Sequence, residues 1–185
     1  TVIGGLAEGL NTDVTVIGYK ASATGLQSVA IGANAKSLDK NATAIGFTAT
    51  ATGADSVAIG TNAAAKYANS VAIGSGSSTA TAASTAKGFI TNSAAPAGEV
   101  SVGTAAAQRR ITNVADGAAA QDAVTVAQLS TSNSNISTSV SSLSTGISSL
   151  STSTSTGLST AVSRDASLST GISSLSTSTS TGLST

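Results

Sequence analysis

Cysteine, histidine, tryptophan and methionine are all absent from the sequence, and only 9% of its residues are charged. Without histidine and cysteine, the chain lacks the usual ligands of transition metals, the commonest general base and the thiol nucleophile. Disulfide bonds are excluded too, so a stable fold must rest on assembly rather than on cross-links. We therefore expect no enzyme, no catalytic residues, no metal site and no cofactor.

The sequence also lacks an excess of charge of either sign, and it lacks long apolar runs. Eight Lys and Arg balance eight Asp and Glu, so no basic field attracts nucleic acid or anionic lipid. Apolar residues form no run of about 18, which argues against a membrane-spanning helix. No basic segment followed by an apolar block opens the sequence, so we expect any export signal to lie outside this segment.

A 14-residue repeat dominates the first part of the chain. Each copy ends in an isoleucine followed by a glycine. The isoleucines, expected to form the core of the repeat, are Ile3, Ile17, Ile31, Ile45, Ile59 and Ile73, and the glycines, expected at its turns, are Gly4, Gly18, Gly32, Gly46, Gly60 and Gly74.

The period of this repeat also equals two heptads, so a coiled coil is the alternative to test. One heptad before the last five isoleucines, an apolar seam would need apolar residues, but the chain has Leu10, Thr24, Leu38, Thr52 and Lys66. Glycine after β-branched residues instead favours strands that end in tight turns.

Alternation within each copy predicts two short strands and two turns, which make one coil of a narrow β-solenoid. Ser56-Val57-Ala58-Ile59 places Val and Ile on one strand face and Ser and Ala on the other. We expect Val and Ile to fill the interior. The small residues then either pack against a neighbouring chain or form a smooth solvated face. Turn formers, mostly residues that tolerate a left-handed conformation, occupy the column Asn11, Gly25, Asp39, Gly53 and Tyr67.

The last part of the chain consists mainly of Ser and Thr, yet its apolar residues recur at alternating steps of three and four. This spacing is typical of a coiled coil. The expected core positions are Val126, Leu129, Asn133, Ile136, Val140, Leu143, Ile147 and Leu150. A Ser/Thr-rich helix is marginal alone, so association must stabilise it. The block that starts at Ser142 returns at Ser167, a distance of three heptads plus four, which predicts a stutter in the supercoil.

The repeats and the segment from Gln108 to Leu129 resemble the head and the neck of trimeric autotransporter adhesins of the Yersinia adhesin type. The resemblance implies a mixed, fibrous homotrimer with a left-handed parallel β-roll head, a neck that exchanges segments between chains, and a parallel trimeric coiled-coil stalk. The expected segments are a head over 1–74, a connector with degenerate coils near Gly88-Phe89-Ile90 over 75–98, a neck over 99–128 and a stalk over 129–185. The expected trimer contacts of the neck are Arg109, Arg110, Ile111, Val114, Asp122 and Val124.

Several polar residues have two interpretations. Arg109 or Arg110 either bridges Asp116 or Asp122 of another chain or is solvated. Asn133 either sets the register of the stalk, or holds an anion on the axis, or is an exposed polar residue. Arg164 and Asp165 form either an interchain pair or a surface pair. One polar column is either a hydrogen-bonded ladder or a calcium site: Asp13, Gln27, Asn41, Asp55 and Asn69.

These observations favour an adhesin at the surface of a Gram-negative cell. It would attach to host-cell or extracellular-matrix molecules, would mediate autoaggregation, and would reach the outer membrane only through an anchor domain outside this segment. A Thr-rich ice-binding solenoid and a purely structural surface fibre are the alternatives. No ligand-binding residue and no receptor can be named from the sequence.

Overall fold

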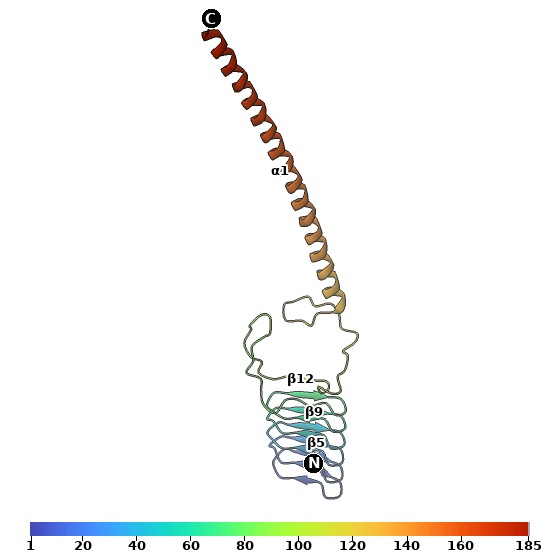
Figure 1. The fold of residues 1–185 in the computed structure, drawn as a ribbon. Helices are drawn as coiled ribbons and strands as arrows, with labels where there is room; N and C mark the ends of the chain where they lie inside the picture. The colour runs from blue at the N-terminus through green and yellow to red at the C-terminus, as the bar shows by residue number, and fades with distance from the viewer. Residues whose placement is uncertain (185) are drawn as a thin grey trace. The chain divides into compact units, whose positions relative to one another are not determined.

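A computed structural model describes residues 1–184, so Thr185, the last residue of the predicted stalk, lies outside the described residues. The chain divides into two compact units, the first over Thr1–Ile111 and the second beginning at Thr112. The first unit is a β-solenoid and the second contains one long helix (Figure 1).

The solenoid consists of two parallel sheets, and each coil contributes one strand to each sheet. The first sheet contains β1 (Val2–Ile3), β3 (Thr15–Ile17), β5 (Val29–Ile31), β7 (Thr43–Ile45), β9 (Val57–Ile59), β11 (Val71–Ile73) and β12 (Val100–Ser101). The second contains β2 (Glu8–Gly9), β4 (Ser22–Ala23), β6 (Lys36–Ser37), β8 (Thr50–Ala51) and β10 (Ala64–Ala65). The predicted pattern of two strands and two turns per coil is confirmed.

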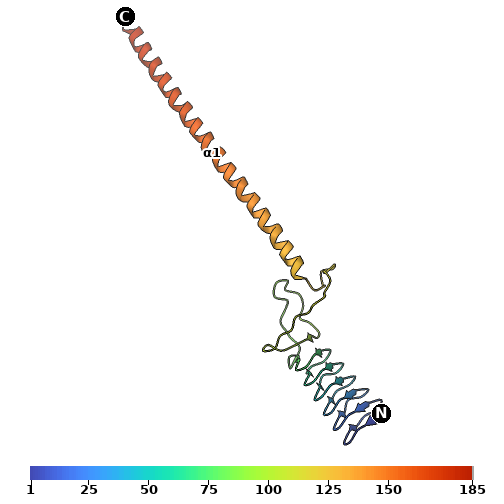
Figure 2. The same ribbon diagram turned by 90° about the vertical axis from the view of Figure 1, so that its right-hand side faces the viewer.

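Successive coils stack in a fixed register that places each residue opposite its equivalent in the next repeat, as Ile31 opposite Ile45 and Ala30 opposite Ala44 show (Figure 2). Backbone hydrogen bonds join each coil to the next, for example from Gly46 N to Ile31 O at 2.8 Å. Because the pairing is parallel and in register, every repeat position becomes a column that runs along the stack.

The interior of the solenoid is made of small side chains. The buried core consists mainly of alanine, and Ala30, Ala44, Ala58 and Ala72 of the first sheet are fully buried. Alanine or serine from the second sheet faces them, as at Ala51 and Ser37. The two sheets therefore lie too close together for larger side chains over most of the stack.

The predicted interior was therefore wrong, because Val and Ile lie on the outer face of the first sheet. Ile59 is 39% exposed and Ile73 is 45% exposed, whereas the alanine between the outward residues of β5, β7, β9 and β11 is fully buried. The expectation that the small face packs against another chain was wrong for the same reason. Side chains alternate along a strand, so the interior set is fixed once the narrow spacing of the sheets admits only the smaller one.

In the first coils, larger residues enter the interior where glycine leaves space. Val14 and Val16 are buried in the second coil. A Cβ atom on Gly9 would lie 2.9 Å from a methyl carbon of Val14 and equally close to one of Val2. A glycine beside valines thus keeps the total side-chain volume inside the first coils close to that inside the coils filled with alanine.

Each of the two turns in a coil contains a non-glycine residue in the left-handed conformation. In the second turn these residues lie two positions after the predicted column of turn formers, which opens the turn: Asp13, Gln27, Asn41, Asp55 and Asn69. In the first turn they are Leu6, Lys20, Asn34, Thr48 and Asn62.

The repeat glycines open the first turn and also have positive φ, between 106° and 136°. A Cβ atom on Gly46 would lie 2.5 Å from the carbonyl oxygen of Gly60. Close stacking of coils therefore requires glycine at this position, and the prediction that these glycines lie at turns agrees with their backbone conformation.

The solenoid continues past the predicted boundary at residue 74. Ser78 bridges to Ala64 in the second sheet, and Val100, assigned to the neck, pairs with Val71 of β11. Residues 80–98 form a loop between these two additions, with no strand where degenerate coils were expected. The side chain of Glu99 accepts a hydrogen bond from Ala80 N and closes the base of the loop.

The second unit contains α1 (Val126–Leu183), which begins three residues before the predicted start of the stalk. At 1.5 Å per residue its 58 residues span about 87 Å. None of its residues is buried. An isolated helix in which apolar side chains face water gains little from packing, so α1 needs a partner.

Ser37 allows a test of the alanine interior. Its hydroxyl is buried without a hydrogen-bond partner among the described residues, in a column that has alanine at positions 23, 51 and 65. An unsatisfied buried hydroxyl costs about 1–3 kcal/mol. We predict that Ser37→Ala raises the free energy of unfolding of the solenoid, measured by thermal or denaturant unfolding.

Ser56→Ala is the matched control, because the Ser56 hydroxyl is equally buried and donates to the Gly53 carbonyl oxygen at 2.6 Å. This change should lower the free energy of unfolding by about 1 kcal/mol. Equal effects of the two substitutions would contradict an unpartnered Ser37 hydroxyl.

Candidate functional site

The outer face of the first sheet carries an apolar surface that runs the length of the stack. We call it the outer stripe, and it consists of two adjacent columns. One contains Thr15, Val29, Thr43, Val57 and Val71, and the other contains the predicted repeat residues Ile3, Ile17, Ile31, Ile45, Ile59 and Ile73. All members are half-buried or exposed, and a continuous apolar surface of this kind is typical of an interface.

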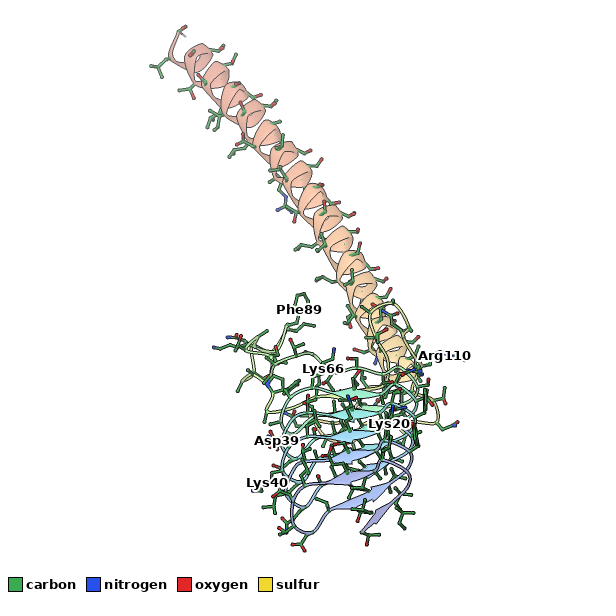
Figure 3. The ribbon with its side chains drawn as sticks, turned by 90° about the horizontal axis from the view of Figure 1, so that it is seen from below. Lys20, Asp39, Lys40, Lys66, Phe89 and Arg110 are labelled. Carbon is green, nitrogen blue, oxygen red and sulfur yellow. The ribbon has the colours of Figure 1, made fainter. Side chains whose placement is uncertain are left out.

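The two turn edges of the stack differ from the stripe because they carry charged and polar residues. Lys20 lies at one edge of the strands and Asp39 and Lys40 lie at the other (Figure 3). At the second edge Asn41 Nδ2 donates to Asp55 Oδ1 at 2.7 Å, which confirms the hydrogen-bonded ladder at this step. Within residues 1–184, no group of three or more acidic, histidine or cysteine side chains could hold a metal ion.

Exposed aromatic residues are confined to turns and the loop. The Lys20 ammonium lies 5.3 Å from the centre of the Tyr19 ring, within cation–π distance. On the 80–98 loop, Phe89 and Ile90 are almost fully exposed, and Phe89 stands clear of the coils in Figure 3.

Arg109 closes the end of the solenoid. Its guanidinium donates to the Ser77 hydroxyl at 2.9 Å and to the carbonyl oxygens of Ser75 and Val102. These acceptors belong to the last turn, where no further coil supplies donors. Gly74 leaves space for the guanidinium, since a Cβ atom there would lie 3.4 Å from Arg109 Cζ.

Neither interpretation of Arg109 included this role: its exposed side chain bonds to backbone and hydroxyl groups of its own chain. Arg110 is exposed too, but within residues 1–184 its guanidinium makes no such hydrogen bond. The signal that the sequence analysis missed is Ser75-Gly76-Ser77, which ends the regular repeats and presents carbonyl groups without a following coil.

A shallow cavity of about 420 Å³ lies at this end of the solenoid, lined by Glu99, Val100, Gly103, Gln108 and Arg109 among others. Val100 is 68% exposed there. The Glu99 and Arg109 side chains at this cavity already bond to backbone groups.

The predicted neck residues of the second unit are exposed in the single chain. Val124 is 67% exposed and Val114 is 41% exposed, and Ile111 at the end of the first unit is 72% exposed. Asp122 bonds within its own turn, where Oδ2 accepts from Ala118 N and Ala119 N, both at 2.9 Å. These two bonds, that of Ala119 first, lower the pKa of Asp122 below its ordinary value because they stabilise the carboxylate.

The start of α1 is fixed by a capping box that the sequence analysis did not identify. Thr125 Oγ1 accepts from Gln128 N at 3.2 Å, and Gln128 Oε1 accepts from Thr125 N at 3.1 Å. The side-chain amide of Gln128 also bonds to the backbone of Gly117. Its Oε1 accepts from Gly117 N at 3.0 Å, and its Nε2 donates to Gly117 O at 2.9 Å. Thr-x-x-Gln before the apolar seam was the available signal.

The predicted seam residues of the stalk lie on one side of α1, and their side chains face water. Apart from Val126 and Asn133, the apolar members from Leu129 to Leu150 are 59–67% exposed. Their spacing places them on one stripe of the helix. Among the described residues, no helix is both long and apolar enough to cross a membrane.

Repeated two-strand coils with an outer apolar stripe, together with a helix that carries an a/d seam, define a repeat-built protein of the fibrous class. Residues 15–35 and 40–63 match two copies of the YadA head domain repeat. Residues 110–152 match the coiled stalk of trimeric autotransporter adhesin. Together these matches support a fragment that is similar to the head repeats and the stalk of YadA-like trimeric autotransporter adhesins.

Individual proteins are similar over shorter or more divergent stretches. The trimeric autotransporter adhesin AtaA of Acinetobacter sp. (strain Tol 5) is 78% identical over 32 residues, which are 17% of this chain and 1% of that protein. The collagen-binding domain of the Yersinia adhesin YadA is 25% identical with a TM-score of 0.43, over 69% of this chain and 87% of that chain. A C-terminal YadA-like domain from Burkholderia pseudomallei is 30% identical with a TM-score of 0.39, over 66% of this chain and 50% of that chain.

The closing role of Arg109 can be tested by substitution. We predict that Arg109→Ala lowers the melting temperature of the solenoid, because it removes charge-assisted hydrogen bonds to two carbonyl groups at its end, each worth about 1.5–3 kcal/mol. Arg110→Ala is the matched control and should leave the melting temperature unchanged. Hydrogen exchange at β11 and β12 measures the same loss locally, and equal exchange in both variants would refute the assignment.

The lowered pKa of Asp122 predicts a pH dependence. A carboxyl group whose pKa is depressed on folding stabilises the fold above its unfolded pKa, about 3.9, and this contribution disappears as pH falls through the folded pKa. An NMR titration should therefore give Asp122 a lower pKa in the native chain than in denaturant. Asp122→Asn should remove this contribution. Identical pKa values in the two states would contradict the two backbone hydrogen bonds.

Proposed function

We propose that this chain is a passenger segment of a surface adhesin and that three identical chains assemble through the outer stripe and the seam of α1. The observation that carries this proposal is that both apolar surfaces lack a partner in the single chain. A solenoid with an alanine interior buries little apolar area per residue. Association removes the stripe and the seam from water together.

The similarity to this family supports the number of chains and the place of action. Its members are trimeric adhesins, and they place such segments at the surface of Gram-negative cells. The polar turn edges, which carry Tyr19, Lys20, Asp39 and Lys40, then remain available on each chain. Three copies of a weak site gain avidity, by as much as about 10²–10⁴ when they engage together.

The kind of partner is a host-cell or extracellular-matrix molecule. One similar structure is described as a collagen-binding domain, and this supports matrix proteins as the first ligands to test. The chain has none of the His or Cys residues on which most catalysis depends, in line with the structural role of adhesin families.

The ice-binding alternative is not favoured, because it requires a flat array of threonine. The outward column of the second sheet reads Ser22, Lys36, Thr50 and Ala64, and that of the first mixes Thr with Val. A purely structural fibre remains distinguishable by its lack of ligand binding.

We predict that the intact chain sediments as a trimer and that Ile59→Ser with Ile73→Ser shifts it toward monomer. Both side chains are already partly exposed, so the coils themselves should retain their circular dichroism. Thr50→Ser on the outer face of the second sheet is the matched control and should leave the trimer intact.

The same proteins are then tested for adhesion to immobilised matrix proteins and to epithelial cells. The intact chain and the Thr50→Ser variant should bind, and the stripe variant should bind much more weakly because avidity is lost. A folded monomeric wild-type chain, or equal adhesion by the monomeric variant, would refute the proposal.

A further inference from the structure

The stalk contains a sequence repeat that leaves its register open. The block 142–160 is identical to the block 167–185, so each seam residue of the first block has a counterpart in the second. Leu143, Ile147 and Leu150 correspond to Leu168, Ile172 and Leu175, and the counterparts are 61–68% exposed on α1. The seams of two neighbouring helices can therefore match in two ways. The helices can pack in register, or one helix can slip so that its second block lies beside the first block of its neighbour. The same apolar layers are in contact in both arrangements.

One short segment between the two blocks breaks this equivalence. Arg164 and Asp165 are the only charged residues in α1. The offset between the blocks aligns Asp165 with Val140 and Arg164 with Ser139. Val140 is a core position of the heptad, and Asp165 also lies three residues before Leu168, as an a position lies before d. Asp165 is therefore a seam residue, and Arg164 is its flanking neighbour.

These two side chains cannot neutralise each other within one chain. Adjacent residues on a helix point about 100° apart, so they do not face each other. Within residues 1–184 neither of them has an ion-pair partner. An aspartate in the seam of an assembled stalk must therefore find its partner on another chain or remain an unpaired charge between apolar layers.

We propose that Asp165 and Arg164 form a ring of interchain ion pairs in the trimer, an assembly on which this inference rests. Each Asp165 carboxylate points toward the seam and accepts hydrogen bonds from Arg164 of the neighbouring chain. Three carboxylates near one axis repel each other unless cations pair with them. Arginine at the flanking position supplies a long side chain and a fork of donors that matches a carboxylate.

The ring also opposes the slip. In a stalk shifted by the offset between the blocks, Asp165 would lie in a layer with Val140, and Leu158 in a layer with Asn133. The charge would then be surrounded by apolar side chains, with its arginine partner displaced. A buried charge that loses its partner is strongly destabilising, so the pair adds to the preference for the in-register stalk that assembly through the outer stripe also favours.

The test uses the whole chain and follows α1 by circular dichroism at 222 nm during thermal unfolding. Arg164→Ser should lower the melting temperature of the helix by at least about 4 °C, because three carboxylates lose their partners. Adding Asp165→Val to that variant, which recreates the Ser-Val pair of residues 139–140, should restore the melting temperature to the wild-type value or above. Ser139→Arg, at the equivalent position without an aspartate, is the matched control and should change little.

The outcomes separate this inference from the proposed trimer. Sedimentation of the wild-type chain establishes the trimer first, and a monomer there refutes the proposed assembly itself. If the wild-type chain is a trimer, a decrease in melting temperature of less than about 1 °C for Arg164→Ser would overturn the ring, because an exposed surface pair contributes that little. If Arg164→Ser abolishes the helix, recovery on adding Asp165→Val supports the ring, and failure to recover overturns it.

Discussion

The close approach of the two sheets of the solenoid is the constraint on which the other features depend. Because the space between the sheets admits mainly alanine, serine and glycine, the larger Val and Ile of each strand must point outward. The coil is then held by its backbone hydrogen bonds and by small-residue packing, and its apolar surface is left for contact with another chain. The narrow interior and the need for association are consequences of the same geometry.

The ends of the repeating elements require their own polar devices. A solenoid that stops leaves carbonyl groups without donors, and here β12 pairs with β11 while Arg109 donates to the last turn. A helix that starts leaves backbone N–H groups without acceptors, and here Thr125 and Gln128 form the capping box. Both devices lie near the change from coils to helix, so the segment between 99 and 128 serves to terminate one fold and begin the other.

The period of the chain could be read directly from its residues, whereas the direction of each side chain could not. Ile and Gly at strictly regular intervals predicted the coil, its two strands and its turns, and the steps of three and four predicted the helix. The assignment of faces was wrong because hydrophobicity alone favours Val and Ile as interior residues. Which alternating set lies inside depends on how far apart the sheets are, and that distance is not a local property.

The sequence by itself determined the repeat architecture, the helical seam, the absence of His and Cys chemistry and the family, since these follow from composition, periodicity and the motifs of the repeats. Only the tertiary structure decided that alanine fills the coils, that Val100 returns to pair with Val71 after the 80–98 loop, and that Arg109 bonds to Ser75 and Ser77. Each of these joins residues far apart in the chain. Such contacts depend on where the backbone places carbonyl groups and side chains in space, and neither period nor composition encodes that.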